Sequence, residues 1–147
     1  MSLPNIQRFN EYTGAILASL YDHFPIRKSL LPKNFIEGGA AAVMVPDDIV
    51  DERLSDEAVF FMETVRWLVE AGYVQCEKVS LDHASEATLT AKALEALNAV
   101  PESLSGKQSL GERLIGAARD GGKHLLRTVA QEAISAGLKA GLKSITM

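Results

Sequence analysis

The chain has 147 residues, of which 47% are hydrophobic and 23% charged, and its formal net charge at pH 7 is -4. This length suffices for one compact domain that needs no metal or disulfide, and the single cysteine, Cys76, excludes an internal disulfide. Charged residues interrupt every apolar run before the roughly 18 residues that a membrane span requires. With neither a span nor a signal sequence indicated, we expect a cytoplasmic protein.

The charges are divided unevenly along the chain. Residues 1–100 carry 8 Lys and Arg against 15 Asp and Glu, whereas residues 101–147 carry 7 against 4. Nonspecific binding to nucleic acid requires Lys and Arg to neutralise phosphates, so the acidic part is poorly suited to it. The candidates for phosphate contacts are five cations: Arg27, Lys28, Lys33, Lys123 and Arg127.

The first fifty residues predict one long helix and little other regular structure. Apolar residues recur at helical spacing over Asn5–Phe24, and Pro25 should end that helix. We expect a short second helix over 29–36. A loop with one short strand should follow over 37–54, where glycines and Pro46 interrupt a small apolar run and acidic residues then dominate.

A second long helix is predicted from Ser55 or Asp56, either of which can serve as its N-cap, to about Ala71. Gly72 provides the C-terminal stop. The apolar residues that this helix should bury to varying degrees are Val59, Phe60, Met62, Val65, Trp67, Leu68 and Val69. Tryptophan is enriched at binding hot spots, but the apolar neighbours of Trp67 favour partial burial in the core over an interface role.

A β-hairpin and a third helix should follow. Tyr73 to Val79 has the composition of a strand, 80–85 is a polar turn, and 87–89 can return as the second strand. Thr90 is a suitable N-cap for a helix that continues to Val100.

The run WLVEAGYV, followed by this hairpin and by LTAKALEAL, resembles the winged helix-turn-helix superfamily over about residues 5–101. The resemblance implies that the helix before the wing enters the major groove of DNA. In this chain that helix carries Glu57, Glu63 and Glu70 against Arg66 alone. The resemblance therefore leaves two functions open, protein interaction and DNA-binding transcription regulation.

Residues 102–147 predict a helical extension with one helix over 110–120 and a second from Lys123, separated by two glycines. In the second helix apolar residues recur every four residues, so their row drifts by about 40° per step and suits a helix that crosses its partner at roughly -50°. Small residues in this row permit close approach. The candidate oligomer interface comprises Leu125, Val129, Ala133, Gly137, Gly141 and the neighbouring Leu138. The same residues also suit packing within the chain, a frayed tail or membrane-surface attachment.

No catalytic residue, cofactor or metal site is predicted. The three histidines and Cys76 lack metal-ligand spacing, and Asp82–His83 has no nucleophile beside it. The acidic residues in 47–52 are typical of a solvated loop.

The sequence thus predicts a mainly α protein with a small β-hairpin, in which a winged-helix-like domain (5–101) precedes a helical C-terminal extension (102–147). We expect a non-enzymatic regulatory or protein-interaction module that self-associates through its C-terminal helices. The alternative is a DNA-binding transcription regulator of winged-helix type.

Overall fold

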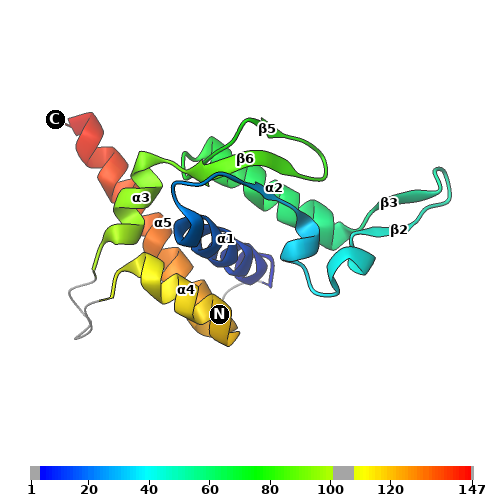
Figure 1. The fold of residues 1–147 in the computed structure, drawn as a ribbon, viewed down its shortest axis with the longest axis horizontal. Coiled ribbons are helices and arrows are strands. Elements are labelled where there is room, and N and C mark those ends of the chain that lie inside the picture. Colours follow the sequence, from blue (N-terminus) through cyan, green and yellow to red (C-terminus); the bar gives the residue numbers. More distant parts are fainter. Residues whose placement is uncertain (1–3, 101–107, 147) are drawn as a thin grey trace.

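The computed structural model describes residues 4–100 and 108–146, with side-chain surroundings as far as residue 139 (Figure 1). Most of these residues are helical, and a small antiparallel sheet accompanies the helices, which confirms the predicted mainly α class. The α-helices are α1 (Pro4–His23), α2 (Asp56–Glu70), α3 (Ala91–Asn98), α4 (Leu110–Asp120) and α5 (Lys123–Thr146).

The strands form two separate groups. In the first, β6 (Ala84–Leu89) pairs antiparallel with β1 (Lys28–Leu30), β4 (Val74–Gln75) and β5 (Lys78–Val79). In the second, β2 (Met44–Pro46) pairs with β3 (Glu52–Leu54). Figure 1 shows this second hairpin, which we call the arm, extending away from the helices at the opposite end of the molecule from the end of α5.

Helix α1 lies at the centre of the molecule and contacts α2, α4 and α5 (Figure 1). Its buried face includes Ile16, Leu17 and Leu20. This helix begins and ends within one residue of the range predicted from its apolar spacing. It is the element against which the rest of the chain packs.

The predicted boundaries of α2 are confirmed by its cap geometry. The Ser55 hydroxyl accepts a hydrogen bond from the Ala58 amide at 3.2 Å, and Gly72 adopts a φ of 85°, which favours glycine. At α3, Thr90 caps the first turn in the same way. This helix ends at Asn98, two residues earlier than predicted, because Ala99 has an extended backbone.

The helix predicted over 29–36 is wrong. Residues 28–30 form β1 instead, and only a short 3₁₀ helix, η1 (Pro32–Asn34), follows. Leu30 is fully buried, and antiparallel pairing with β6 satisfies backbone groups of the strand. Leu31 precedes a proline and is extended, with φ -121° and ψ 131°, as the steric effect of Pro32 requires.

The predicted loop over 37–54 is more ordered than expected. It contains a second 3₁₀ helix, η2 (Gly39–Ala42), and both strands of the arm rather than one short strand. Strand β6 begins at Ala84, three residues before the predicted start, and therefore shortens the polar turn. Pairing with a neighbouring strand defines these strands, so local composition underestimates them.

The C-terminal helices complete the same core as the first hundred residues. Helix α4 starts at a capping box formed by Ser109 and Glu112, and Gly121 ends it with a φ of 71°. Leu114 and Val129 are fully buried in one cluster with Ile16 and Phe61. Among the described residues, no helix is both long and apolar enough to cross a membrane.

Candidate interaction site

The exposed face of α2 carries regularly spaced acids. Asp56, Glu63 and Glu70 follow one another at seven-residue intervals, close to two helical turns, and therefore lie along one side of the helix. All three are exposed. Two apolar side chains share this stripe, Val59 with 43% of its surface exposed and Trp67 with 42%. Trp67 is therefore partly buried, as predicted, but a large part of its indole lies at the surface.

An open groove of about 610 Å³ runs between the first turns of α1 and the exposed side of α2. Its apolar lining comes from both helices. The residues that line it are Asn5, Ile6 and Phe9 of α1, and Phe60, Glu63, Thr64, Arg66, Trp67 and Glu70 of α2. We call this feature the α1–α2 groove.

Aromatic contacts hold Trp67 in a fixed position. The rings of Phe9 and Trp67 meet edge to face, with centroids 5.1 Å apart and an interplanar angle of 87°. Behind the indole, the Tyr73 ring stacks at 6.4 Å and 12°. The Tyr73 hydroxyl donates a hydrogen bond to the carbonyl oxygen of Ile134 at 2.6 Å, so α5 supports this aromatic stack.

The charges in the groove are only weakly engaged. Arg66 Nε lies 3.7 Å from Glu63 Oε1, and both side chains are about half exposed. Such surface pairs contribute little free energy, typically about 0 to 1 kcal/mol. Glu70 forms no ion pair with any described residue. Both carboxylates are therefore accessible to a ligand.

A second charged cluster lies between α1, α2 and the start of α5. Glu57 accepts a hydrogen bond from the Tyr12 hydroxyl and pairs with Arg8 at 3.2 Å, and Arg127 donates to Glu11 at 3.0 Å. The pKa of Tyr12 is raised well above its ordinary value, mainly by burial and then by the bond to Glu57. These pairs join three helices, which is a structural role.

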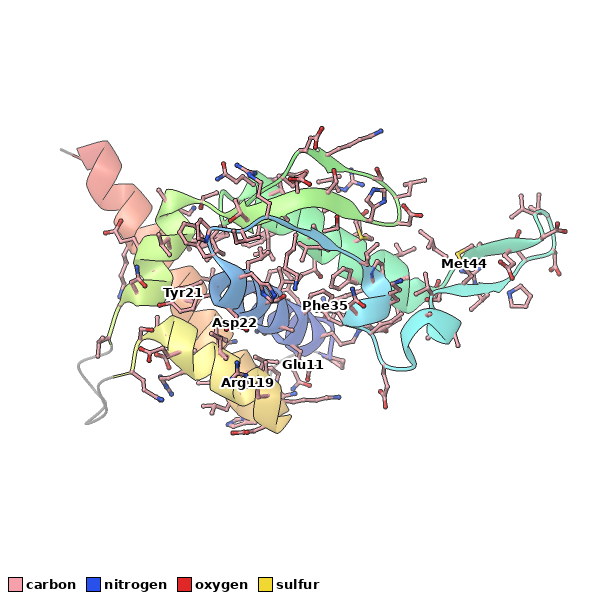
Figure 2. All side chains as sticks on the ribbon, in the orientation of Figure 1. Glu11, Tyr21, Asp22, Phe35, Met44 and Arg119 are labelled. Carbon is pink, nitrogen blue, oxygen red and sulfur yellow. The ribbon has the colours of Figure 1, made fainter. Side chains whose placement is uncertain are left out.

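The residues predicted to contact phosphate do not form one surface. Lys28 Nζ donates to Ser19 Oγ at 2.7 Å and lines a cleft that also contains Arg119. Arg119 itself pairs with Asp22 at 3.8 Å (Figure 2). Arg27 donates to the carbonyl oxygen of Glu86 at 3.2 Å.

The other three predicted phosphate contacts lie on two elements, with Lys33 on η1 and both Lys123 and Arg127 on α5, about one helical turn apart. Lys123 lines a separate cleft that includes Glu11, Glu37 and Glu57. Arg127 is engaged by Glu11 in the cluster described above. The structure therefore distributes the five cations among several sites, some of them beside carboxylates.

Much of the predicted oligomer interface is buried within the chain. Val129 and Ala133 are 0% and 1% exposed, and the backbone of Gly137 lies against the Tyr73 ring. Leu125 and Leu138 are exposed by 43% and 53%. The side-chain surroundings of Gly141 lie outside the described residues. Along its described length α5 packs against α1, α3 and α4 of its own chain, and self-association through it stays a prediction.

The remaining chemical candidates are isolated groups. Cys76 is half-buried, and burial raises the pKa of its thiol. His83 Nδ1 lies 2.8 Å from Asp82 Oδ1 in the exposed turn before β6. Among the residues that the structure describes, no group of three His, Cys, Asp or Glu side chains could hold a metal ion.

Sequence reasoning missed the contribution of α1 to the groove, since the apolar spacing over Asn5–Phe24 predicts a helix but does not show that Ile6 and Phe9 line a groove with α2. One signal was present in α2, where apolar residues cover more of the circumference than a single core-facing stripe requires. Val59 and Trp67 are this excess. Comparisons of the chain with protein-family models, curated proteins and solved structures found no match.

Proposed function

We propose that this chain is a non-enzymatic regulatory module of winged-helix type that binds a segment of another protein in the α1–α2 groove. The observation that carries the proposal is Trp67, a large aromatic residue that is 42% exposed and held by Phe9 and Tyr73 at the groove. Interface hot spots are enriched in tryptophan and tyrosine that sit in well-packed surroundings. A pre-positioned indole loses little conformational entropy on binding.

The winged-helix part of the proposal is supported by the order of elements. Helix α2, the hairpin that β6 makes with β4 and β5, and then α3 follow in the sequence that the resemblance implies. In that arrangement α2 is the helix expected to meet DNA. Its exposed face carries carboxylates and Trp67 where phosphate contacts would require cations, and this favours a protein ligand.

The non-enzymatic part is supported by the chemistry of the groove. The hydroxyl of Thr64, which could act as a nucleophile, is turned to its own helix and donates to the Phe60 carbonyl oxygen at 2.9 Å. Thr64 is also buried. The groove presents aromatic surface and two carboxylates, which suit binding, and a volume within the range of ligand sites, about 300 to 1,000 Å³.

Self-association through the C-terminal helices is a further part of the proposal. Among the described residues of the predicted interface, Leu125 and Leu138 remain exposed, so self-association would have to use these two side chains. The molar mass of the full chain, measured by light scattering, tests it. A dimer that becomes a monomer in the double variant Leu125→Ala/Leu138→Ala would support it. A full-length monomer would refute it.

The groove is tested by selecting peptides from an unbiased displayed library against the full chain. The selected peptides should lose at least about thirtyfold in affinity for Trp67→Ala, since truncation at a hot spot costs about 2 kcal/mol or more. Ile6→Ser, on the opposite wall, provides a second variant that spares the aromatic stack. Met44→Ser is the matched control, because Met44 lies on the arm, outside the groove, and is 41% exposed against 43% for Ile6.

Two results would overturn the proposal. One is a set of selected peptides whose affinity is unchanged in both groove variants while circular dichroism shows that the variants are folded. The other is tight binding to duplex DNA that weakens steeply with salt, which would identify phosphate contacts and the DNA-binding alternative.

A further inference from the structure

We infer that the segment bound in the α1–α2 groove is a cationic amphipathic helix, in which Lys or Arg residues flank large apolar side chains. This inference rests on the proposed function and adds the chemistry of the partner. It follows from the pattern of charge and apolar surface along α2.

The spacing of the acids suits a helical ligand laid along α2. At 1.5 Å per residue, Asp56 and Glu70 are separated by about 21 Å along the helix axis, with Glu63 midway. Val59 and Trp67 alternate with these acids on the same face. A ligand helix of about four turns can therefore place apolar residues against Trp67 and cations opposite the carboxylates.

The carboxylates of α2 can exchange their present ion-pair partners for cations of a ligand at a small cost in free energy. Asp56 pairs with Arg53 at 3.3 Å, yet its side chain is 95% exposed. Glu63 is 63% exposed and lies 3.7 Å from Arg66. Because exposed pairs of this kind have little net stability, an incoming Lys or Arg competes with them readily, and Glu70 has no described ion-pair partner to displace.

The aromatic residues add a second preference for cations. The guanidinium of Arg8 already lies over the Phe60 ring at 4.0 Å from its centroid, beside the groove. A cation of the ligand can contact the exposed indole of Trp67 in the same way, and tryptophan is the best ring for this interaction. An acidic segment would instead meet three carboxylates, as would the same face of a second copy.

The sharpest test uses three synthetic peptides of fourteen residues that share one helical pattern of leucines. Their remaining positions are all Lys, all Gln or all Glu. Trp67 is the only tryptophan of the chain, so its fluorescence reports binding at the groove. The Lys peptide should bind most tightly and lose affinity as salt rises, the Gln peptide should bind more weakly, and the Glu peptide should not bind.

Two double variants that remove the same number of negative charges show whether the Lys peptide is bound by the acids of the groove or by the net negative charge of the protein. Glu63→Gln/Glu70→Gln should weaken binding of the Lys peptide by about tenfold, because two exposed ion pairs with the peptide are lost. Glu52→Gln/Glu95→Gln changes the net charge equally at exposed positions on the arm and on α3, and it should leave the affinity unchanged.

Equal affinity for the Lys and Gln peptides, or equal weakening by both charge variants, would overturn the inference. A free chain that is dimeric until Trp67→Ala makes it monomeric would also overturn it, because a second copy would then occupy the groove. If the unbiased selection yields uncharged peptides that depend on Trp67, the groove remains an interaction site and only the cationic partner is refuted. If the affinity of none of the selected peptides depends on Trp67, the proposed function is refuted as well.

Discussion

At the scale of single residues, Gly137 shows how closely α5 approaches the rest of the chain. A Cβ atom added there would lie 2.4 Å from Cε1 of Tyr73, a ring that is 1% exposed and hydrogen-bonded to Ile134. The ring cannot move without breaking that bond or displacing Trp67. Gly137→Ala should therefore lower the free energy of unfolding by about 1 to 3 kcal/mol, as overpacked core positions do, measured by urea denaturation.

Gly116 in α4 is the matched control for this substitution. It lies inside a helix, and a Cβ atom added there would have no neighbour within 4 Å. Gly116→Ala should raise the free energy of unfolding by about 0.5 to 1 kcal/mol through helix propensity alone. Equal effects of the two substitutions would contradict the close contact between Gly137 and Tyr73.

At the scale of elements, the carboxylate of Asp47 holds the turn of the arm. Asp47 Oδ2 accepts hydrogen bonds from the backbone amides of Ile49 at 3.0 Å and Val50 at 3.1 Å, while Arg53 lies 3.6 Å from Oδ1. The amides of Val50 and then Ile49 lower the pKa of Asp47 below its ordinary value of 3.8. The turn also holds Ile49, which lies between β2 and β3 and is 94% exposed.

Because the folded-state pKa of Asp47 is lowered, its carboxylate stabilises the arm above pH 3.8, and this contribution is lost as the pH falls through the folded-state pKa. We expect carboxyl NMR titration to give Asp47 a midpoint below 3.8. Amide exchange at Ile49 and Val50 should accelerate as the carboxyl group becomes protonated. Asp47→Asn should remove this acid dependence. A midpoint at or above 3.8 would show that the turn is not held by this carboxylate.

At the scale of the whole molecule, the chain has one core to which its C-terminal helices belong. Leu114 of α4 and Val129 of α5 are both fully buried, and they share a cluster with Leu17 and Phe61. The predicted boundary after residue 101 thus separates elements that bury one another's apolar surface. The arm, in contrast, extends beyond this core (Figure 1).

A chain that ends at Pro101 should therefore fail to fold cooperatively. It would lack α4 and α5 and expose the side of α1 that these helices cover. Loss of several buried leucine-sized side chains costs about 2 to 5 kcal/mol each, which approaches the entire stability of a small domain. Thermal unfolding followed by circular dichroism should show no sharp transition, whereas a cooperative transition would establish residues 5–101 as an independent domain.

The parts of the fold that are encoded locally could be predicted from the sequence. Ser55, Gly72, Thr90 and Gly121 mark helix ends through caps and positive φ angles, and the structure confirms each of these signals. Residues 28–30 could not be assigned in this way. Their extended form depends on pairing with β6, whose residues follow more than fifty positions later.

The sequence by itself determined the helical class, most helix boundaries and the acidic face of α2, because caps, apolar periodicity and charge act over a few neighbouring residues. Only the tertiary structure decided which apolar faces are covered. It buried Val129 and Ala133 inside the chain and left Trp67 at a groove shared with Ile6 and Phe9. Exposure of a helix face depends on which distant helices pack against it, and the sequence of the helix alone does not contain that information.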